Sequence, residues 1–273
     1  MGPRAGRGAQ GLDGGAGLTP ELLDLAVAAA LRAGTILTER FGEEATGVRT
    51  KSTRTDLVSD ADTASEQAIV DLISAERPDD GWLGEEGASA VSRSGITWIV
   101  DPLDATVNYL FGIPVWCLSV AAADDSGTLA GVVHDPNRGE TFTATRGGGA
   151  FLGDSPIRVS ERDDLATALV GTGFAYDAAT RAVQAEVVAR VLPAVRDIRR
   201  MGSAALDLCS VACGRLDGYY EGWVQPWDKA AGTLLVREAG GVVSDLPDER
   251  GGPPGVVAAG QRLHAALEAL VLA

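Results

Sequence analysis

The chain has 273 residues with 23 basic and 38 acidic side chains, which gives a net charge of −15 at pH 7. This length is enough to bury a substantial core in one large domain or two modest ones. Because the charge is strongly negative and no dense Lys/Arg stripe is present, the sequence argues against binding of nucleic acid or anionic membranes through bulk electrostatics.

Cysteine and histidine usage narrows the class further. Cys117, Cys209 and Cys213 are an odd number in apolar contexts, which indicates free thiols in a reducing cytoplasm. With only His134 and His264 available, a His-rich zinc site is excluded and a Ser-His-Asp triad is disfavoured. No apolar run approaches the roughly 20 residues that a membrane span needs.

The first elements are expected to be a tail and two helices. Residues 1–18 are rich in Gly, lack the apolar region of a secretory signal and are predicted to be a disordered tail. Thr19, as N-cap before Pro20, predicts a helix that continues to Phe41 and stops at Gly42. Apolar spacing predicts a second helix from about residue 62 to Pro78, after a polar and irregular stretch.

The middle of the chain reads as a β-rich region. Short connections between its strands predict an antiparallel meander. The cluster Gly147-Gly148-Gly149 then marks a plausible boundary, so we expect an N-terminal α+β domain over residues 19–150 and a C-terminal domain over 151–273. The predicted strands are Ile96–Val100, Trp116–Ala123, Leu129–His134 and Thr141–Thr145.

The remaining sequence alternates strand and helix, which indicates an α/β layer. The predicted strands are Leu169–Gly171, Gly218–Glu221, Gly241–Ser244 and Val256–Ala259; the predicted helices are Arg181–Val191, Ser203–Arg215, Lys229–Ala239 and Arg262–Leu272.

The run Asp101-Pro102-Leu103-Asp104-Ala105-Thr106 is the most informative feature. It places two carboxylates and a hydroxyl where a buried strand ends and a helix is expected to begin at Thr106. Clustered carboxylates repel one another unless a cation holds them, and Mg²⁺ prefers oxygen ligands. The run therefore favours metal-dependent phosphate chemistry, although an Asp-Pro turn with an Asp N-cap explains the same letters.

Two further segments deliver acids at the end of a strand or the start of a helix. Glu85 and Glu86 follow Trp82-Leu83-Gly84, and Asp228 precedes a clear helix. Each has a simple alternative, a solvated loop pair or an N-cap. Their convergence on one metal site is the stronger interpretation, since Mg²⁺ sites are assembled from such distant carboxylates. A covalent aspartyl-phosphate mechanism is less favoured, because it needs acids two residues apart, whereas Asp101 and Asp104 are three apart.

Three other motifs are interpreted as structural. The stretch from Cys209 to Arg215 has the Cys-x5-Arg spacing of cysteine phosphatases, but helical periodicity runs straight through it and predicts buried helix cysteines. The segment from Asp60 to Ser65 resembles the start of a calcium loop but lacks the Gly that such a loop requires at its sixth position. The glycines at 147–149 are expected to form a turn rather than a nucleotide loop.

Taken together, these segments resemble the inositol monophosphatase family, in the family's order and from about residue 20 to the end of the chain. Any one segment is modest evidence, whereas the ordered set is highly specific. The matching runs are Lys51…Asp56-Leu57-Val58-Ser59…Asp62, Gly84-Glu85-Glu86-Gly87, Trp98-Ile99-Val100-Asp101-Pro102-Leu103-Asp104-Ala105-Thr106-Val107-Asn108-Tyr109, Arg200-Met201-Gly202-Ser203-Ala204-Ala205, Asp217-Gly218-Tyr219-Tyr220-Glu221 and Trp227-Asp228-Lys229-Ala230-Ala231…Glu238-Ala239-Gly240-Gly241.

The resemblance implies a layered αβαβα sandwich, a homodimer and a Mg²⁺-dependent, lithium-sensitive phosphomonoesterase that uses two or three ions. It implies that Glu85, Asp101, the Leu103 carbonyl, Asp104 and Asp228 hold two Mg²⁺ ions. Asp62 would position a further ion or its water. Thr106 would orient the nucleophilic water, and Asp62 and Glu85 would be the other catalytic residues. Phosphate would meet the amides of Ala105 and Thr106, and the substrate would also contact Asp104, Gly202, Ala204, Glu221 and Asp228.

The expected reaction is hydrolysis of myo-inositol monophosphate, a small phosphorylated polyol, to inositol and phosphate. Where the family usually has Gly, this chain has Ala105, which costs on the order of 1 kcal/mol if φ is positive. Glu221 suits neutral hydroxyls and disfavours a second phosphate. Histidinol phosphate and other sugar or nucleotide phosphates stay open as substrates, and a non-catalytic regulatory binding protein is the alternative from another class.

Overall fold

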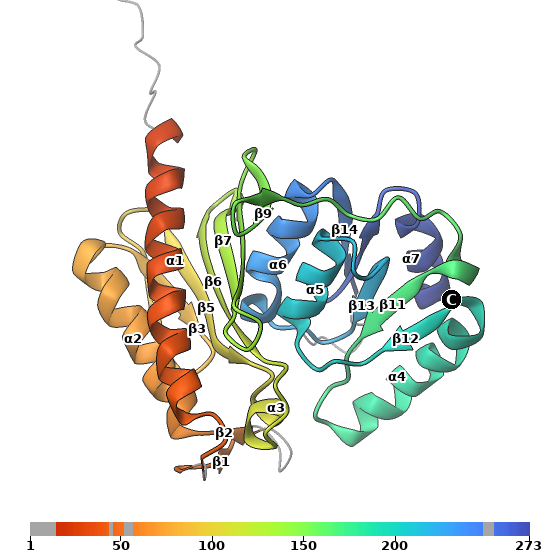
Figure 1. Ribbon diagram of the computed structural model, residues 1–273, viewed down its shortest axis with the longest axis horizontal. Coiled ribbons are helices and arrows are strands. Elements are labelled where there is room, and N and C mark those ends of the chain that lie inside the picture. The colour runs from red at the N-terminus through yellow and green to blue at the C-terminus, as the bar shows by residue number, and fades with distance from the viewer. Residues whose placement is uncertain (1–14, 44–45, 52–56, 248–253) are drawn as a thin grey trace, which may run out of the picture.

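The computed structural model describes residues 15–43, 46–51, 57–247 and 254–273. Figure 1 shows five layers: a helix pair, a large sheet, a second helix pair, a smaller sheet and a third helix pair. The predicted αβαβα sandwich is therefore confirmed. The outer pair is α1 (Gly15–Arg40) and α2 (Asp60–Glu76), the central pair α5 (Ala204–Ala212) and α6 (Pro226–Glu238), and the third pair α4 (Ala178–Val191) and α7 (His264–Leu272).

The larger sheet has eight strands in the order β10-β9-β8-β7-β6-β5-β3-β4. From β5 to β10 each strand pairs antiparallel with the next, which is the predicted meander, and β3 joins β5 in parallel. Its strands are β3 (Gly81–Gly84), β4 (Ser89–Ala90), β5 (Thr97–Asp104), β6 (Cys117–Asp124), β7 (Gly127–Asp135), β8 (Glu140–Thr145), β9 (Gly149–Leu152) and β10 (Ser155–Pro156).

The smaller sheet has five strands in the order β12-β11-β13-β15-β14 and mixes parallel and antiparallel pairs. Its strands are β11 (Leu169–Thr172), β12 (Asp197–Arg199), β13 (Gly218–Glu221), β14 (Gly241–Leu246) and β15 (Gly255–Gly260); the remaining short elements are β1 (Arg49–Thr50), β2 (Leu57–Val58), α3 (Thr106–Leu110), η1 (Leu165–Thr167) and η2 (Leu192–Ala194).

Apolar side chains form the interfaces between these layers. The central helices lie between two sheets, so α5 is buried on nearly all sides and residues from Ala205 to Ala212 are shielded from solvent. This burial confirms the interpretation of Cys209 as a buried helix cysteine, whereas Cys213 caps the C-terminus of α5 and is half-buried. All three cysteines are free, as expected.

The start of the first helix differs from the prediction. Helix α1 begins at Gly15, and Pro20 lies inside it rather than at its first position. Leu18 packs against the core between α1 and the large sheet, and this contact carries the helix upstream of Thr19. Residues 15–18 are therefore not a tail, while residues 1–14 lie outside the described part of the chain. The division near residue 150 stays a prediction.

Strand β5 also runs further than predicted. It continues through Asp101 to Asp104, although Pro102 interrupts it and its pairing with β6 shifts register between the two acids. The acids are thus part of an irregular strand end and not of a turn beyond it. In the described residues, no helix is long and apolar enough to cross a membrane.

Candidate active site

A hollow of about 400 Å³ collects the residues that the sequence singled out. Glu85, Asp101, Asp104 and Asp228 all line it, although they come from β3's end, β5 and the start of α6. Of the expected site residues only Asp62 is not in its wall. The others that line it are Leu103, Ala105, Thr106, Gly202, Ala204 and Glu221.

The irregular end of β5 explains how Asp101 and Asp104 share one hollow. Acids three residues apart would face opposite sides of a regular strand, but the register shift between them restores a common side. The Leu103 N–H donates to Asp101 Oδ1 over 3.0 Å and fixes that bend. Ala105 then adopts φ 75° and ψ 46°, a left-handed conformation, before α3 starts at Thr106.

Asp104 is held by the start of α5. Its Oδ2 accepts the Ser203 hydroxyl at 2.6 Å and the Ala205 N–H at 2.8 Å. Burial raises the pKa of Asp104 to about 6, against the opposing effect of these hydrogen bonds. A helix start is a favourable place for a carboxylate, because free N–H groups and the helix dipole face it.

Asp62 lies behind the wall and acts on it through Thr106. The Thr106 hydroxyl lies 3.0 Å from Asp62 Oδ1 and 3.1 Å from the Leu103 carbonyl oxygen. Asp62 Oδ2 accepts the Ser59 N–H and hydroxyl, so the residue is also part of a capping box at the start of α2. Burial raises the pKa of Asp62 despite these donors.

Glu85 belongs to the turn between β3 and β4, next to a cation of the chain itself. Lys51 Nζ lies 2.8 Å from Glu85 Oε1 and also contacts Glu86 Oε1. Burial alone would lower the pKa of Lys51, but the two carboxylates outweigh it and the net shift is upward. Burial raises the pKa of Glu86 to about 7, with Lys51 opposing that shift.

Neighbouring carboxylates act on the ionisation of Asp101 and Asp228. Burial raises the pKa of Asp101, and the charges of Glu85, Asp104 and Asp228 raise it further. The pKa of Asp228 is likewise raised by burial first and then by Asp104 and Glu85. Such mutual repulsion marks a cluster that needs positive charge.

The same hollow is lined by the residues expected to meet the alcohol part of a substrate, Gly202, Ala204 and Glu221. Glu221 accepts the Tyr219 hydroxyl, and burial raises its pKa to about 7. Gly202 has φ +100°, and a Cβ there would lie 2.6 Å from Arg200 Nη1, so only glycine fits without rearrangement.

The sequence model of the inositol monophosphatase family matches residues 19–272. The chain belongs to this family. An inositol-1-monophosphatase from Mycobacterium leprae is 48% identical over 217 residues, which are 76% of this chain and 74% of the relative. A Nus factor SuhB from Xylella fastidiosa is 44% identical over 82% of both chains. The crystal structure of extragenic suppressor protein SuhB from Bartonella henselae matches with a TM-score of 0.85 and 38% identity, covering 92% of this chain and 98% of that one.

This family member is thus a phosphoric monoester hydrolase. The oxygen atoms that line its hollow are suitable ligands for the metal ions of such enzymes. The four acids and the Leu103 carbonyl offer only oxygen, which Mg²⁺ prefers. Within the described ranges, however, no three His, Cys, Asp or Glu side chains are arranged so that they could hold an ion as they stand. The Lys51 ammonium contacts Glu85, so a divalent ion at that carboxylate would require a side-chain shift.

Sequence reasoning assigned no role to several residues in the wall of the hollow. Arg200 lies over the Phe174 ring, 5.9 Å from its centroid, and Trp223 has a positive φ of 63°. These residues lie in irregular loops, where no helical or strand periodicity of the sequence predicts their position. Lys51 was visible as part of a matching motif, but its ion pair with Glu85 depends on the fold.

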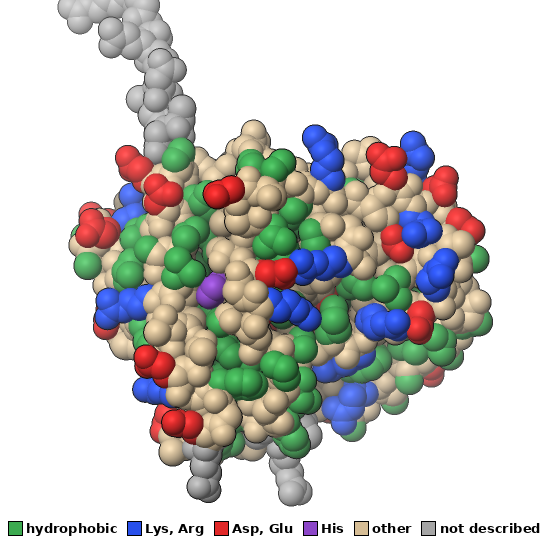
Figure 2. All heavy atoms as spheres, viewed as in Figure 1, with side chains coloured by type: hydrophobic (Ala, Val, Ile, Leu, Met, Phe, Trp, Pro, Cys, Tyr) green, Lys and Arg blue, Asp and Glu red, His purple; other side chains and the backbone are tan. Residues whose placement is uncertain are grey.

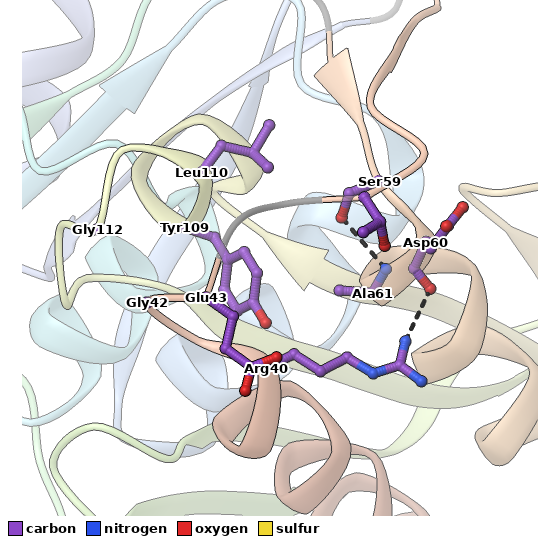
Figure 3. A pocket seen from close by; sticks show the side chains of 10 residues that line it. Arg40, Gly42, Glu43, Ser59, Asp60, Ala61, Tyr109, Leu110 and Gly112 are labelled. Atoms are coloured by element: carbon purple, nitrogen blue, oxygen red, sulfur yellow. Dashed lines mark hydrogen bonds between the residues drawn. The ribbon is translucent and has the colours of Figure 1, made fainter.

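A second cavity of about 470 Å³ lies between the end of α1, the start of α2 and α3. Figure 3 shows Tyr109 and Ser59 on its walls and Arg40 Nη1 donating to the Asp60 carbonyl oxygen at 3.1 Å. None of the expected site residues lines it. Among the described residues its lining includes Glu43 and Thr46 but no cluster that suggests a ligand, so it carries no assignment.

Proposed function

We propose that this chain hydrolyses myo-inositol monophosphate to inositol and phosphate with Mg²⁺. The observation that carries the proposal is the convergence of Glu85, Asp101, Asp104 and Asp228 on one hollow, where burial and neighbouring carboxylates raise the pKa of Asp101 and of Asp228. These acids and the Leu103 carbonyl would hold two ions, and Asp62 would serve a third or its water. When bound, Mg²⁺ neutralises charge on the phosphate and lowers the pKa of water.

The residues beside the acids have the geometry to handle the attacking water. Thr106 Oγ1 is within hydrogen-bond distance of Asp62 Oδ1, so a water that donates to Thr106 is linked through that hydroxyl to a buried carboxylate. The Ala105 and Thr106 N–H groups at the start of α3 would donate to the phosphate. Glu85, which lines the same hollow, would assist Thr106 and Asp62 with this water.

The proposed substrate depends on the chemistry of the Glu221 side chain. A half-buried carboxylate beside the hollow can accept hydrogen bonds from polyol hydroxyls, and it repels a second phosphate. The same carboxylate could pair with an ammonium group, which keeps histidinol phosphate as the competing substrate. Comparing kcat/KM for inositol 1-phosphate and histidinol phosphate decides between them, and a preference for histidinol phosphate would overturn the substrate assignment.

The proposal includes inhibition by lithium, a homodimer and a reducing cytoplasm as the location, the last because all three cysteines are free. The substrate is a small molecule rather than a nucleic acid. On the face seen in Figure 2, basic side chains are interspersed with acidic ones, which does not favour a polyanion.

Relatives named Nus factor SuhB, 42% to 44% identical, favour a second candidate, a regulatory protein that acts by binding. A protein that only binds has no need for four acids around one hollow. Phosphate release from a panel of sugar phosphates, with and without chelator, separates the two candidates. Release that chelator abolishes supports the phosphatase, whereas release that is absent or insensitive to chelator supports the regulatory protein.

A further inference from the structure

Helix α2 presents three polar side chains, at positions i, i+3 and i+4, to the segments that carry the residues of the hollow. Asp62, Ser65 and Glu66 lie on one face of the helix because this spacing returns to the same side. All three are buried, with exposed fractions of 0%, 0% and 8%. Asp62 contacts Thr106, as described above, while Ser65 and Glu66 have no part in the proposed chemistry.

Glu66 grips the turn that carries Glu85. Its Oε1 accepts the Glu86 N–H at 3.0 Å and its Oε2 accepts the Ala88 N–H at 3.2 Å, so each oxygen holds one end of the turn. Gly84 makes this approach possible, because a Cβ there would lie 2.2 Å from Glu66 Oε1. The Glu85 N–H donates to the Val100 carbonyl oxygen at 3.2 Å, which ties the same turn to β5.

Ser65 grips the bulge that carries the other two acids. Its hydroxyl donates to the Pro102 carbonyl oxygen at 2.7 Å, between Asp101 and Asp104 in the chain. Pro102 has no N–H that could pair with a neighbouring strand, so this segment forms fewer backbone hydrogen bonds than a regular strand. One helix face thus contacts α3, the β5 bulge and the β3–β4 turn.

A carboxylate is a costly choice for a purely structural clamp. Among the described residues Glu66 forms no ion pair, and its hydrogen bonds go to backbone amides. Burial raises its pKa, while the two amides lower it. Outer residues that orient metal ligands are typically charged or strongly polar, and losing one weakens metal binding about 10- to 100-fold.

We propose that Glu66, assisted by Ser65, is a positioning residue that holds Glu85 and the β5 acids in one arrangement for the metal. The inference rests on the proposed function for the metal itself, but the grip on the turn is a property of the metal-free chain. The two can therefore be measured separately.

Glu66→Gln is the decisive variant, because it keeps the length but replaces one acceptor oxygen with an NH₂ group that faces a donor. In the metal-free protein, amide hydrogen exchange at Glu86 and Ala88 should accelerate. Binding of Mn²⁺, followed by the paramagnetic signal of the free ion, should weaken by about 10-fold or more. The Mg²⁺ concentration for half-maximal activity should rise by the same factor, with kcat at saturating Mg²⁺ within about twofold of wild type.

Glu76→Gln is the matched control, since Glu76 is an exposed glutamate on the last turn of the same helix. It should leave exchange and Mn²⁺ binding unchanged. Ser65→Ala is the milder second variant and should weaken Mn²⁺ binding in the same direction; it decides the matter if Glu66→Gln does not fold.

Unchanged exchange and Mn²⁺ affinity in folded Glu66→Gln would overturn the inference. So would a loss of kcat at saturating Mg²⁺ with unaltered metal affinity, because positioning of the ligands would then not be the role. If the wild type itself fails to bind Mn²⁺, the proposed function fails, and the exchange comparison still decides whether Glu66 holds the turn.

Discussion

Ala105 carries strain at the centre of the site. Its φ of 75° lies in the left-handed region, where a Cβ is unfavourable, and the family resemblance places glycine at this position. Ala105 is buried beside the hollow. Its backbone keeps the left-handed conformation because the β5 bulge precedes it and α3 follows it. The methyl group is thus tolerated rather than required.

Replacing Ala105 with glycine should relieve this strain. We expect Ala105→Gly to raise the free energy of unfolding by up to about 1 kcal/mol, a rise in Tm of about 2–4 °C for a chain of this size. Thermal unfolding followed by circular dichroism measures the change. A lower Tm would mean that the methyl group makes favourable contacts that outweigh the left-handed backbone.

Asp104 tests the proposed metal role at a single residue. Asp104→Asn keeps a side-chain oxygen for Ser203 and Ala205, so the fold should persist, as judged by circular dichroism. We expect kcat/KM to fall by more than about 100-fold, because even outer partners of a metal ligand are worth 10- to 100-fold. Full activity in the variant would contradict the metal role of Asp104.

At the scale of elements, three helices start at the hollow and small residues bring them there. Helices α3, α5 and α6 begin at Thr106, Ala204 and Pro226, and residues from the start of each line its wall. Helix α6 lies close on the large sheet because Gly131 of β7 has no side chain. A Cβ at Gly131 would lie 2.9 Å from the Cα of Ala231.

Gly131→Val should push α6 away from the sheet and displace Asp228 at its start. We expect a loss of about 1–3 kcal/mol in the free energy of unfolding, the usual cost of overpacking. Because Asp228 would move with the helix, kcat/KM should fall and the Mg²⁺ requirement should rise. A variant that is destabilised but has normal metal dependence would show that Asp228 is placed independently of this contact.

For the whole molecule, buried acids set an unusual dependence of stability on pH. Burial raises the pKa of Glu221 from 4.5 to about 7, and it also raises the pKa of Asp207, whose Oδ1 is buried without a hydrogen-bond partner. Between pH 4.5 and 7 the folded protein keeps a proton on Glu221 that the unfolded chain has released. The contribution of Glu221 to the free energy of unfolding therefore falls as pH rises.

The metal-free Glu221→Gln variant isolates this effect. The difference in Tm between the variant and wild type should grow in favour of the variant from pH 4.5 to 7, since Gln does not ionise. Above pH 7 this difference should stay constant. Comparison with wild type is needed because Asp124, Glu140 and Asp197 have lowered pKa values and contribute with the opposite sign. An identical pH profile for both proteins would contradict the raised pKa of Glu221.

Much of the architecture follows from local patterns. Helical spacing located α2, α5 and α6 within a few residues, and strand patterns found the meander from β5 to β8. The short strands were not found, since β4, β10 and β12 have two or three residues and little apolar alternation. The upstream start of α1 was also missed, because it depends on the packing of Leu18 in the tertiary core.

The sequence by itself determined which acids to examine, because carboxylates at strand ends and helix starts stand out against an apolar background. Only the tertiary structure decided that Asp101 and Asp104 face the same side, since a register shift in β5 cannot be read from their spacing. The pairing of Lys51 with Glu85 and the grip of Glu66 on the Glu85 turn were equally hidden. These contacts join residues 20 or more positions apart, and such distances are set by how the layers pack rather than by any local preference of the chain.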